Sequence, residues 1–267
     1  MILDILAYGF IQKAIIVGII ISIACSLLGV FLVLRKNALI GDGLAHIAFG
    51  GVATGLLFNI VPFIGALIFS LLGAIGITKI KEKTNLAGDA SIGIISHASL
   101  GIGIFLVSIA QGYNVDILGY LFGSILAIKT SELIFSIILG LLVIGFIVYY
   151  YKELLATTYD ETTAKTLGIN TNLINLLLIT LTALTIVSSM RVVGLLLASA
   201  LIILPASTAL QLNLGFKKTI ISSAIIGVMS VIIGLVLSYA FNWAVSGTIV
   251  VINVIIFFIS VLIFRQG

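Results

Sequence analysis

The sequence is poor in charged residues, which make up 8% of its 267 positions, whereas hydrophobic residues make up 61%. A soluble domain carries roughly 25% charged residues. So few charges cannot cover a water-facing surface, and this shortage excludes the soluble domains that the length alone would allow. Most of the surface must therefore face lipid or other helices.

Cysteine and proline are also scarce. Cys25 is the single cysteine, so neither an intrachain disulfide nor a cluster of thiolate ligands can form. Of the two prolines, Pro62 opens an apolar run and Pro205 lies inside another, where it should kink a helix. No GxxxxGK[ST] loop occurs, so the chain cannot hydrolyse ATP through that motif. Residues 1–12 carry no basic n-region, and we expect no cleaved signal peptide.

Long apolar runs fill most of the sequence. They are about 20 residues long and do not alternate as barrel strands do, so they predict membrane-spanning helices. We therefore predict an all-α, polytopic bundle of eight to nine transmembrane helices that forms a single membrane domain over 1–267. The expected spans are 14–34, 44–60, 62–78, 90–110, 131–151, 173–189, 192–212, 219–243 and 248–264.

One further apolar segment, 117–128, is too short to cross a hydrocarbon core of about 30 Å at about 1.5 Å per residue. It predicts a re-entrant or half-membrane helix. If the loop after the first span is cytoplasmic and this segment returns to its own side, ten of the 13 Lys and Arg residues lie inside. The N-terminus is then outside and the C-terminus inside. This bias explains the net charge of +4 better than a nucleic-acid-binding patch, so no nucleic-acid partner is expected.

Asp42 and His46 are ionisable residues beside the span 44–60. A spacing of four places them on one face of a helix. A carboxylate oxygen and an imidazole nitrogen form a half-site for a divalent cation such as zinc, manganese or iron. Ionisable groups near the membrane interior usually mark a pathway. On spacing alone an alternative stays open, namely an interfacial carboxylate near Arg35 and a histidine hydrogen-bonded within the bundle.

Two further residues are candidate metal ligands. His97, the only other histidine, lies in the span 90–110 and either completes the site or bonds to a neighbouring carbonyl or hydroxyl. Asp116 precedes the short segment and is either a helix N-cap or a carboxylate on an external access path for the metal.

The longest polar loop, 152–172, is a candidate docking site. Asp160 and Glu161 precede a short helical stretch that ends at Gly168, which is a suitable start and stop for a helix. The loop is either a solvated connector or a docking helix for a cytoplasmic partner.

Ordered motifs along nearly the whole chain resemble the permease subunits of zinc/manganese/iron-type ABC importers. The first, LRKNALIGDGLAH, covers 34–46 and contains both Asp42 and His46. The others are DASIGI at 89–94, LFGSIL at 121–126, the loop segment 159–168, VGLLLASALIILPA at 193–206 and SGT at 246–248.

This resemblance implies a homodimeric pore in a prokaryotic cytoplasmic membrane, a cytoplasmic ABC ATPase subunit and an extracytoplasmic metal-binding protein. The pore subunit itself would not be an enzyme and would hold no covalently bound cofactor. Asp42 and His46 match positions that touch the transported cation. Segment 159–168 matches the coupling segment, with the expected coupling residues Tyr159, Asp160, Glu161, Ala164 and Gly168.

A function of another class remains as the alternative. In an ATP-independent secondary transporter or channel for cations, Asp42 and His46 would act as an ion or proton relay. Dependence of transport on an ATPase partner distinguishes the two functions.

Overall fold

The computed structural model describes residues 9–83, 88–109, 117–123, 130–190 and 193–264, and these parts are helices joined by short turns. The helices, in chain order, are α2 (Gly9–Leu34), α3 (Ile40–Leu57), α4 (Pro62–Lys83), α5 (Gly88–Ile109), α6 (Ile117–Phe122), α7 (Thr130–Tyr149), α8 (Tyr151–Tyr159), α9 (Glu161–Thr166), α10 (Thr171–Ser189), α11 (Leu195–Gln211), α12 (Phe216–Phe241) and α13 (Val245–Phe264).

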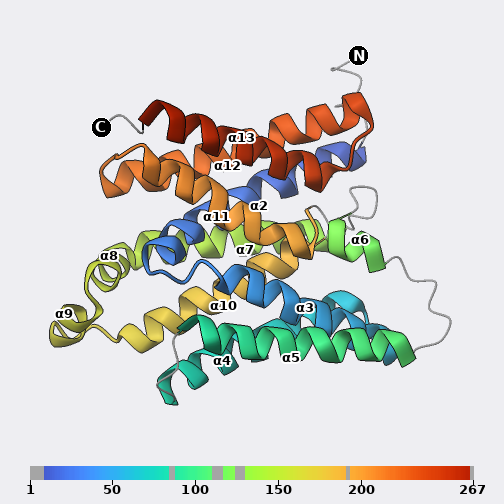
Figure 1. Cartoon of the computed structure of the whole chain (residues 1–267), viewed down its shortest axis with the longest axis horizontal. Coiled ribbons are helices and arrows are strands. Elements are labelled where there is room, and N and C mark those ends of the chain that lie inside the picture. Colours follow the sequence, from blue (N-terminus) through green and yellow to red (C-terminus); the bar gives the residue numbers. More distant parts are fainter. Residues whose placement is uncertain (1–8, 84–87, 110–116, 124–129, 191–192, 265–267) are drawn as a thin grey trace.

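The long helices lie side by side with alternating directions (Figure 1). We call the two ends of this bundle the α9 end and the α6 end, after the short helices that lie there. Helices α2, α4, α7, α11 and α13 run toward the α9 end, whereas α3, α5, α10 and α12 run toward the α6 end (Figure 1). Because α5 arrives at the α6 end and α7 leaves from it, the short helix α6 lies at that end of the bundle (Figure 1). It covers the first half of the predicted short segment 117–128, and residues 124–128 lie outside the described residues.

Eight helices in the described part of the chain are long and apolar enough to cross a membrane. Helix α11 is a shorter apolar helix, because Gly194 interrupts the expected span 192–212 before the helix begins. Gly194 has a φ of 86°, and a Cβ atom there would lie 2.2 Å from the Leu121 carbonyl oxygen of α6. The prediction of a polytopic helical bundle with eight to nine spans is confirmed.

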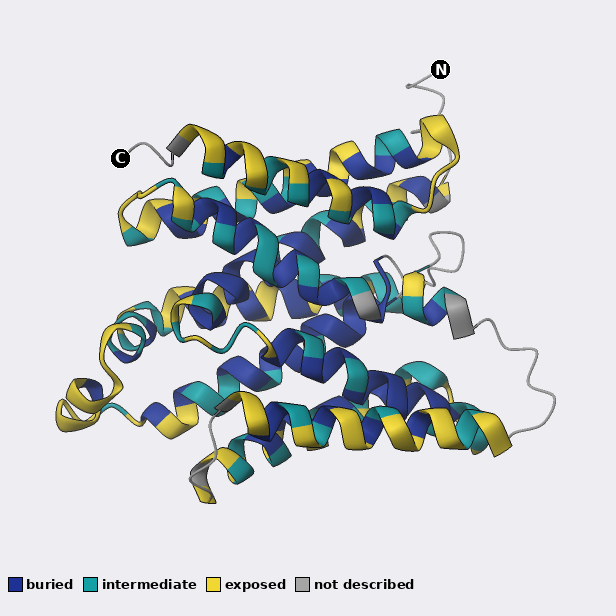
Figure 2. Cartoon of the chain, in the orientation of Figure 1, coloured by how far each residue is buried: buried dark blue, intermediate teal, exposed yellow. Residues whose placement is uncertain are grey.

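The centre of the bundle is formed by α2, α3, α10 and α11 (Figure 2). In α3, 72% of the spanning segment is buried, compared with only 17% in α5. The large hydrophobic residues of α5, including Ile102, Ile104 and Phe105, are exposed on the surface of the chain. Helix α3 is therefore enclosed by its neighbours, whereas α5 presents an apolar face to lipid or to another protein.

Glycines allow the neighbours of α3 to approach it closely. A Cβ atom on Gly51 would lie 2.3 Å from the Gly65 carbonyl oxygen of α4, and one on Gly65 would lie 2.2 Å from the Gly51 carbonyl oxygen. The same Cβ on Gly65 would lie 3.2 Å from the Cα atom of Gly55. The small-xxx-small pair at Gly51 and Gly55 thus forms a backbone contact between α3 and α4.

We predict that Gly51→Ala destabilises the protein, because the added methyl group meets backbone atoms of α4 that cannot move aside. Overpacking of this kind costs about 1–3 kcal/mol. Thermal unfolding of the detergent-purified protein measures the loss. Gly145→Ala in α7 is the matched control, because a Cβ atom there meets nothing within 4 Å. Equal melting temperatures for the two variants would contradict the close contact.

Candidate metal half-site and coupling segment

Asp42 and His46 both lie in the first half of α3. The helix follows a tight turn in which Lys36 has a φ of 57° and the Ile40 amide donates to the Asn37 carbonyl at 3.1 Å. Figure 1 shows that α3 begins inward from the α9 end, where α2 stops. Asp42 is therefore placed within the bundle and not in an outer loop.

The two side chains face each other one helical turn apart. His46 Nε2 lies 3.5 Å from Asp42 Oδ2, and the side chains are 21% and 49% exposed, respectively. Ser199 of α11 faces the same carboxylate. His46 Nδ1 is buried and has no hydrogen-bond partner among the described residues. The pair therefore has a closed side against α11 and an open side at the surface of the chain.

His97 of α5 lies beside this pair, and its ring centroid is 6.2 Å from that of His46. Its Nδ1 atom donates a hydrogen bond to the Gly93 carbonyl oxygen at 2.8 Å. When the proton sits on Nδ1, the lone pair of a neutral imidazole is on Nε2. Because His97 is exposed, its Nε2 atom is available to coordinate a metal ion. Asp116, the fourth candidate ligand, lies outside the described residues.

Within the described residues, no group of three or more His, Cys, Asp or Glu side chains is already arranged to hold a metal ion. The structure thus brings Asp42, His46 and His97 to one place but leaves them open. A structural zinc site is normally closed by four ligands. The arrangement found here can contribute ligands to a cation, but one chain does not enclose it.

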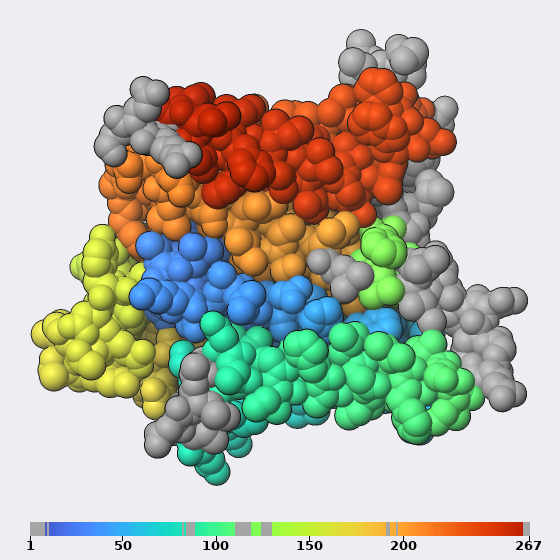
Figure 3. All heavy atoms as spheres, in the orientation of Figure 1, coloured from blue at the N-terminus to red at the C-terminus, as the bar shows by residue number. Residues whose placement is uncertain are grey.

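The predicted coupling loop 152–172 contains most of α8, all of α9 and the start of α10. Helices α8 and α9, called the coupling segment below after this predicted role, protrude from the α9 end (Figure 3). The Asp160 carboxylate caps α9, accepting hydrogen bonds from the Thr162 and Thr163 amides at 2.9 and 3.2 Å. Hydrogen bonds from the hydroxyls and amides of the same two threonines hold the pKa of the Asp160 carboxyl well below its usual range. Asp160 therefore stays ionised at neutral pH and continues to cap α9.

Glu161 is the first residue of α9. Its carboxylate contacts Lys165 at 3.0 Å and accepts a hydrogen bond from the Thr171 hydroxyl at 3.3 Å. Partial burial raises the pKa of Glu161, but the contacts with Lys165 and Thr171 outweigh this and lower it overall. Glu161 therefore ties the start of α9 to the start of α10.

The other expected coupling residues have different surroundings. Tyr159 is 77% exposed, whereas Ala164 is only 1% exposed and packs on the inner side of α9. Gly168 has a φ of 82° and forms the turn that ends this helix. The sequence analysis did not single out Leu167, which is 71% exposed beside that turn. The only signal in the sequence was a leucine within a polar loop. Helix α9 has six residues, which is too few for an amphipathic pattern to show whether Leu167 at its end points inward or outward.

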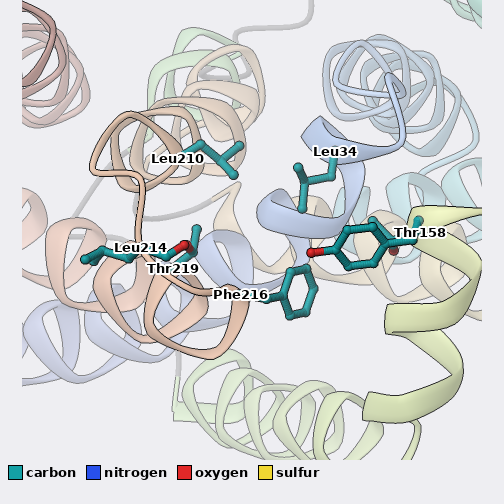
Figure 4. A pocket seen from close by; sticks show the side chains of 7 residues that line it. Leu34, Thr158, Leu210, Leu214, Phe216 and Thr219 are labelled. Carbon is teal, nitrogen blue, oxygen red and sulfur yellow. The ribbon is translucent and has the colours of Figure 1, made fainter. Parts of the chain in front are cut away.

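The coupling segment is attached to the bundle on two sides. On one side, Phe216 at the start of α12 contacts the rings of Tyr151 and Tyr159, with centroid distances of 6.0 and 6.3 Å. A cavity of about 170 Å³ lies here between α2, α8, α11 and α12, with Leu34 and Phe216 among its lining residues (Figure 4). On the other side, Arg35 contacts α8 and α10. The sequence analysis counted Arg35 only as a positive charge, because nothing in the sequence separates it from Lys36.

A family model for ABC 3 transport matches residues 7–264 of the chain. The chain belongs to the ABC 3 transport family. This confirms the resemblance that the ordered motifs indicated.

Membrane proteins from several bacteria are similar to this chain. "Manganese transport system membrane protein MntC" of Listeria innocua is 36% identical over 96% of this chain and 91% of its own length. "High-affinity zinc uptake system membrane protein ZnuB" of Haemophilus influenzae is 35% identical over 92% of this chain and 95% of its own length.

A solved structure, "PsaBC from Streptococcus pneumoniae in complex with Fab", contains a chain that resembles the fold described above. The TM-score is 0.86 and the sequence identity is 34%, and the match covers 98% of this chain and 95% of that one. The likeness therefore extends over the half-site helix α3 and over the coupling segment.

We predict that Asp160→Ala loosens α9, because two amides lose their acceptor. Hydrogen exchange of the amides over 161–166 should become about fivefold faster, as for loss of other N-caps. Asp160→Asn, which keeps a capping oxygen, is the control. Unchanged exchange in Asp160→Ala would refute the role of the cap.

The same amides should show no loss of protection between pH 7 and pH 5. A carboxyl with a depressed pKa contributes stability that is fully present above its unfolded pKa of about 3.9 and is lost as the pH falls through the lower folded value.

Proposed function

We propose that this chain is the membrane-spanning subunit of an ATP-driven importer that moves a divalent transition-metal cation across the cytoplasmic membrane. The observation that carries the proposal is the Asp42/His46 pair, a partly exposed carboxylate and imidazole on a helix in the centre of a membrane bundle. Ionisable groups within membrane-spanning helices are costly and rare, and they usually serve transport. The names of the family members, which include manganese and zinc systems, support the same substrate class.

The open side of the half-site supports a homodimer. The Asp42 side chain is 49% exposed although His46 and Ser199 face it, so its open side can take a further polar partner within the membrane. A second copy related by two-fold symmetry would place its own Asp42 and His46 opposite the first pair. Two carboxylates and two imidazoles then provide four ligands, a set that suits zinc, manganese or ferrous iron. The exposed apolar residues of α5 lie next to this opening and supply surface for the contact between copies.

We assign His97 a secondary place at the same site. Its free Nε2 adds an imidazole donor, which increases the affinity for zinc more than that for manganese. Asp116 keeps its proposed place on the external access path from its sequence position alone.

The distribution of charge supports an orientation with the α9 end in the cytoplasm. Of the described Lys and Arg residues, only Lys13 lies near the α6 end, where it donates a hydrogen bond to Thr130 at 3.0 Å. The others belong to helix ends or turns at the α9 end, and positive charge favours the cytoplasmic side. The N-terminus is then outside and the C-terminus inside. The ATPase subunit would bind the coupling segment, and the extracytoplasmic metal-binding protein would deliver its cation at the α6 end.

We infer an alternating-access cycle from this arrangement. The cation enters from the α6 end, is held by Asp42 and His46 of two copies, and leaves toward the α9 end when the ATPase subunits close. A cargo must be released as well as bound, and a site shared between two copies opens when they move apart.

We predict that Asp42→Ala and His46→Ala each reduce metal uptake to the background level, because each removes two of the four ligands in the dimer. Uptake of zinc, manganese and ferrous ions is measured in cells that lack their own importers. Thr54→Ala, on the same helix but outside the half-site, is the control. All variants should elute as folded protein in size-exclusion chromatography after solubilisation in detergent. Normal uptake by both Asp42→Ala and His46→Ala would refute the half-site.

We predict that Tyr159→Ser combined with Leu167→Ser weakens association with the ATPase subunit at least about tenfold, because two exposed side chains at the centre of the docking surface are lost. Co-purification of the two subunits measures this. Phe58→Ser is the matched control. Phe58 is a similarly exposed hydrophobic residue, at 66%, but it follows α3 at the α6 end. If only Phe58→Ser lost co-purification with the ATPase subunit, docking at the α9 end would be contradicted.

The same material tests the alternative function. Metal uptake by the chain reconstituted without an ATPase subunit would favour a secondary transporter or channel over the importer.

A further inference from the structure

Arg35 makes a set of contacts that the half-site and the docking surface do not explain. It follows α2 directly, and its half-buried guanidinium donates to three side chains and one carbonyl. Nε donates to the Thr158 hydroxyl at 3.0 Å, and Nη2 donates to the Thr157 hydroxyl and to the Leu154 carbonyl oxygen, the latter at 3.4 Å. Nη1 donates to the Asn175 side-chain oxygen. One residue thus joins the end of α2 to both α8 and α10.

The acceptors on α8 are oriented for this purpose. The Thr157 hydroxyl donates to the Glu153 carbonyl oxygen at 2.7 Å, and the Thr158 hydroxyl donates to the Leu154 carbonyl oxygen at 2.6 Å. Because each proton is directed along its own helix, each hydroxyl oxygen is left to accept from the guanidinium. Burial lowers the pKa of Arg35 to about 10, so the group stays charged at neutral pH. Charged donors give the stronger hydrogen bonds.

The turn between Arg35 and the half-site is held by its own hydrogen bonds. The Lys36 amide donates to Val33 at 3.0 Å, and the Asn37 amide donates to Leu32 at 2.9 Å. The Ile40 amide then donates to Asn37 at 3.1 Å, which begins α3. A turn tied in this way moves as a unit, so a displacement of Arg35 reaches the start of α3 and its Asp42.

A cavity beside Arg35 leaves room for such a displacement. It has a volume of about 200 Å³ and separates the end of α4 from the coupling segment, with Lys81 of α4 and Glu161 and Lys165 of α9 in its lining. Arg35 also lines this cavity. The coupling segment can therefore shift against α4 while it remains attached to α2 through the guanidinium.

We propose that Arg35 is the positioning residue that transmits movement of the coupling segment to the metal half-site. The inference rests on the proposed function of the chain as the pore subunit of an ATP-driven importer. When the ATPase moves α8 and α9, the guanidinium carries the end of α2 with them, and the hydrogen-bonded turn moves Asp42 and His46. Arg35 does not touch the cation; it sets the position of the residues that do.

The test is the ratio of metal transported to ATP hydrolysed, measured in one sample of the full complex in liposomes. The complex contains the chain, its ATPase subunit and the external metal-binding protein. Arg35→Gln should lower the ratio about tenfold while ATP hydrolysis continues, a size typical of energetic coupling between sites. Arg35→Lys keeps the charge but loses the forked donors, and its ratio should lie between those of Arg35→Gln and the wild type.

A second variant leaves Arg35 in place. The double variant Thr157→Val and Thr158→Val removes two acceptors on α8, and it should lower the ratio in the same direction. Lys36→Gln is the matched control, because it removes the adjacent but exposed positive charge, and its ratio should equal that of the wild type.

Each remaining outcome overturns the inference or its basis. An unchanged ratio in Arg35→Gln and in the threonine double variant refutes the inference. Uptake and hydrolysis that fall together, with a lower melting temperature, assign Arg35 to folding alone. If Arg35→Gln does not fold, the threonine variant and Arg35→Lys decide. A wild-type complex that moves no metal contradicts the proposed function instead, so the two failures are distinguishable.

Discussion

The free-energy cost of a polar group in hydrocarbon is the constraint on which the rest of this structure depends. It accounts for a chain built of helices, whose backbone groups bond internally, and for the placement of Lys and Arg at helix ends. It also accounts for the hydroxyl residues within the spans, since Thr182, Thr185 and Ser189 of α10 each donate to a carbonyl of their own helix. Against this background, a partly exposed Asp42 in the first half of α3 is an exception, which the proposed cation site would explain.

Much of this fold follows from the sequence because hydropathy reports directly on the solvent. The spans, the short helix α6 and the pairing of Asp42 with His46 all rest on run length or on helical spacing. The start of α11 could not be predicted in this way, because it depends on the contact between Gly194 and α6, which lies about 70 residues earlier in the chain. The inward position of Ala164 and the contacts of Arg35 are likewise tertiary. A single side chain in a loop carries no sign of what it touches.

The half-site and the coupling segment are connected through the turn between α2 and α3. Helix α2 ends at Leu34, the turn that starts at Arg35 returns the chain into the bundle, and the proposed metal ligands Asp42 and His46 lie in the first half of α3. Helices α8 and α10 meet the same point from the other side. Force applied to the coupling segment would therefore have a short path to a cation at the proposed half-site and need not cross α12 and α13, which carry exposed apolar residues. Those helices are free to serve as surface.

The glycines of α3 have a consequence for how the metal preference of such a protein can change. Positions 43, 50 and 51 accept no larger residue without a collision, because a Cβ atom at each would lie within 2.5 Å of a neighbouring helix. On α5, by contrast, a Cβ atom on Gly93 or Gly101 would meet nothing within 4 Å. The face of α5 that packs on α3 at Ile92 and Ser99 is thus constrained, whereas positions such as Gly93 and Gly101 have space for a larger side chain. Substitutions that change the surroundings of the proposed half-site without repacking the bundle therefore belong on the exposed side of α5, where His97 also lies.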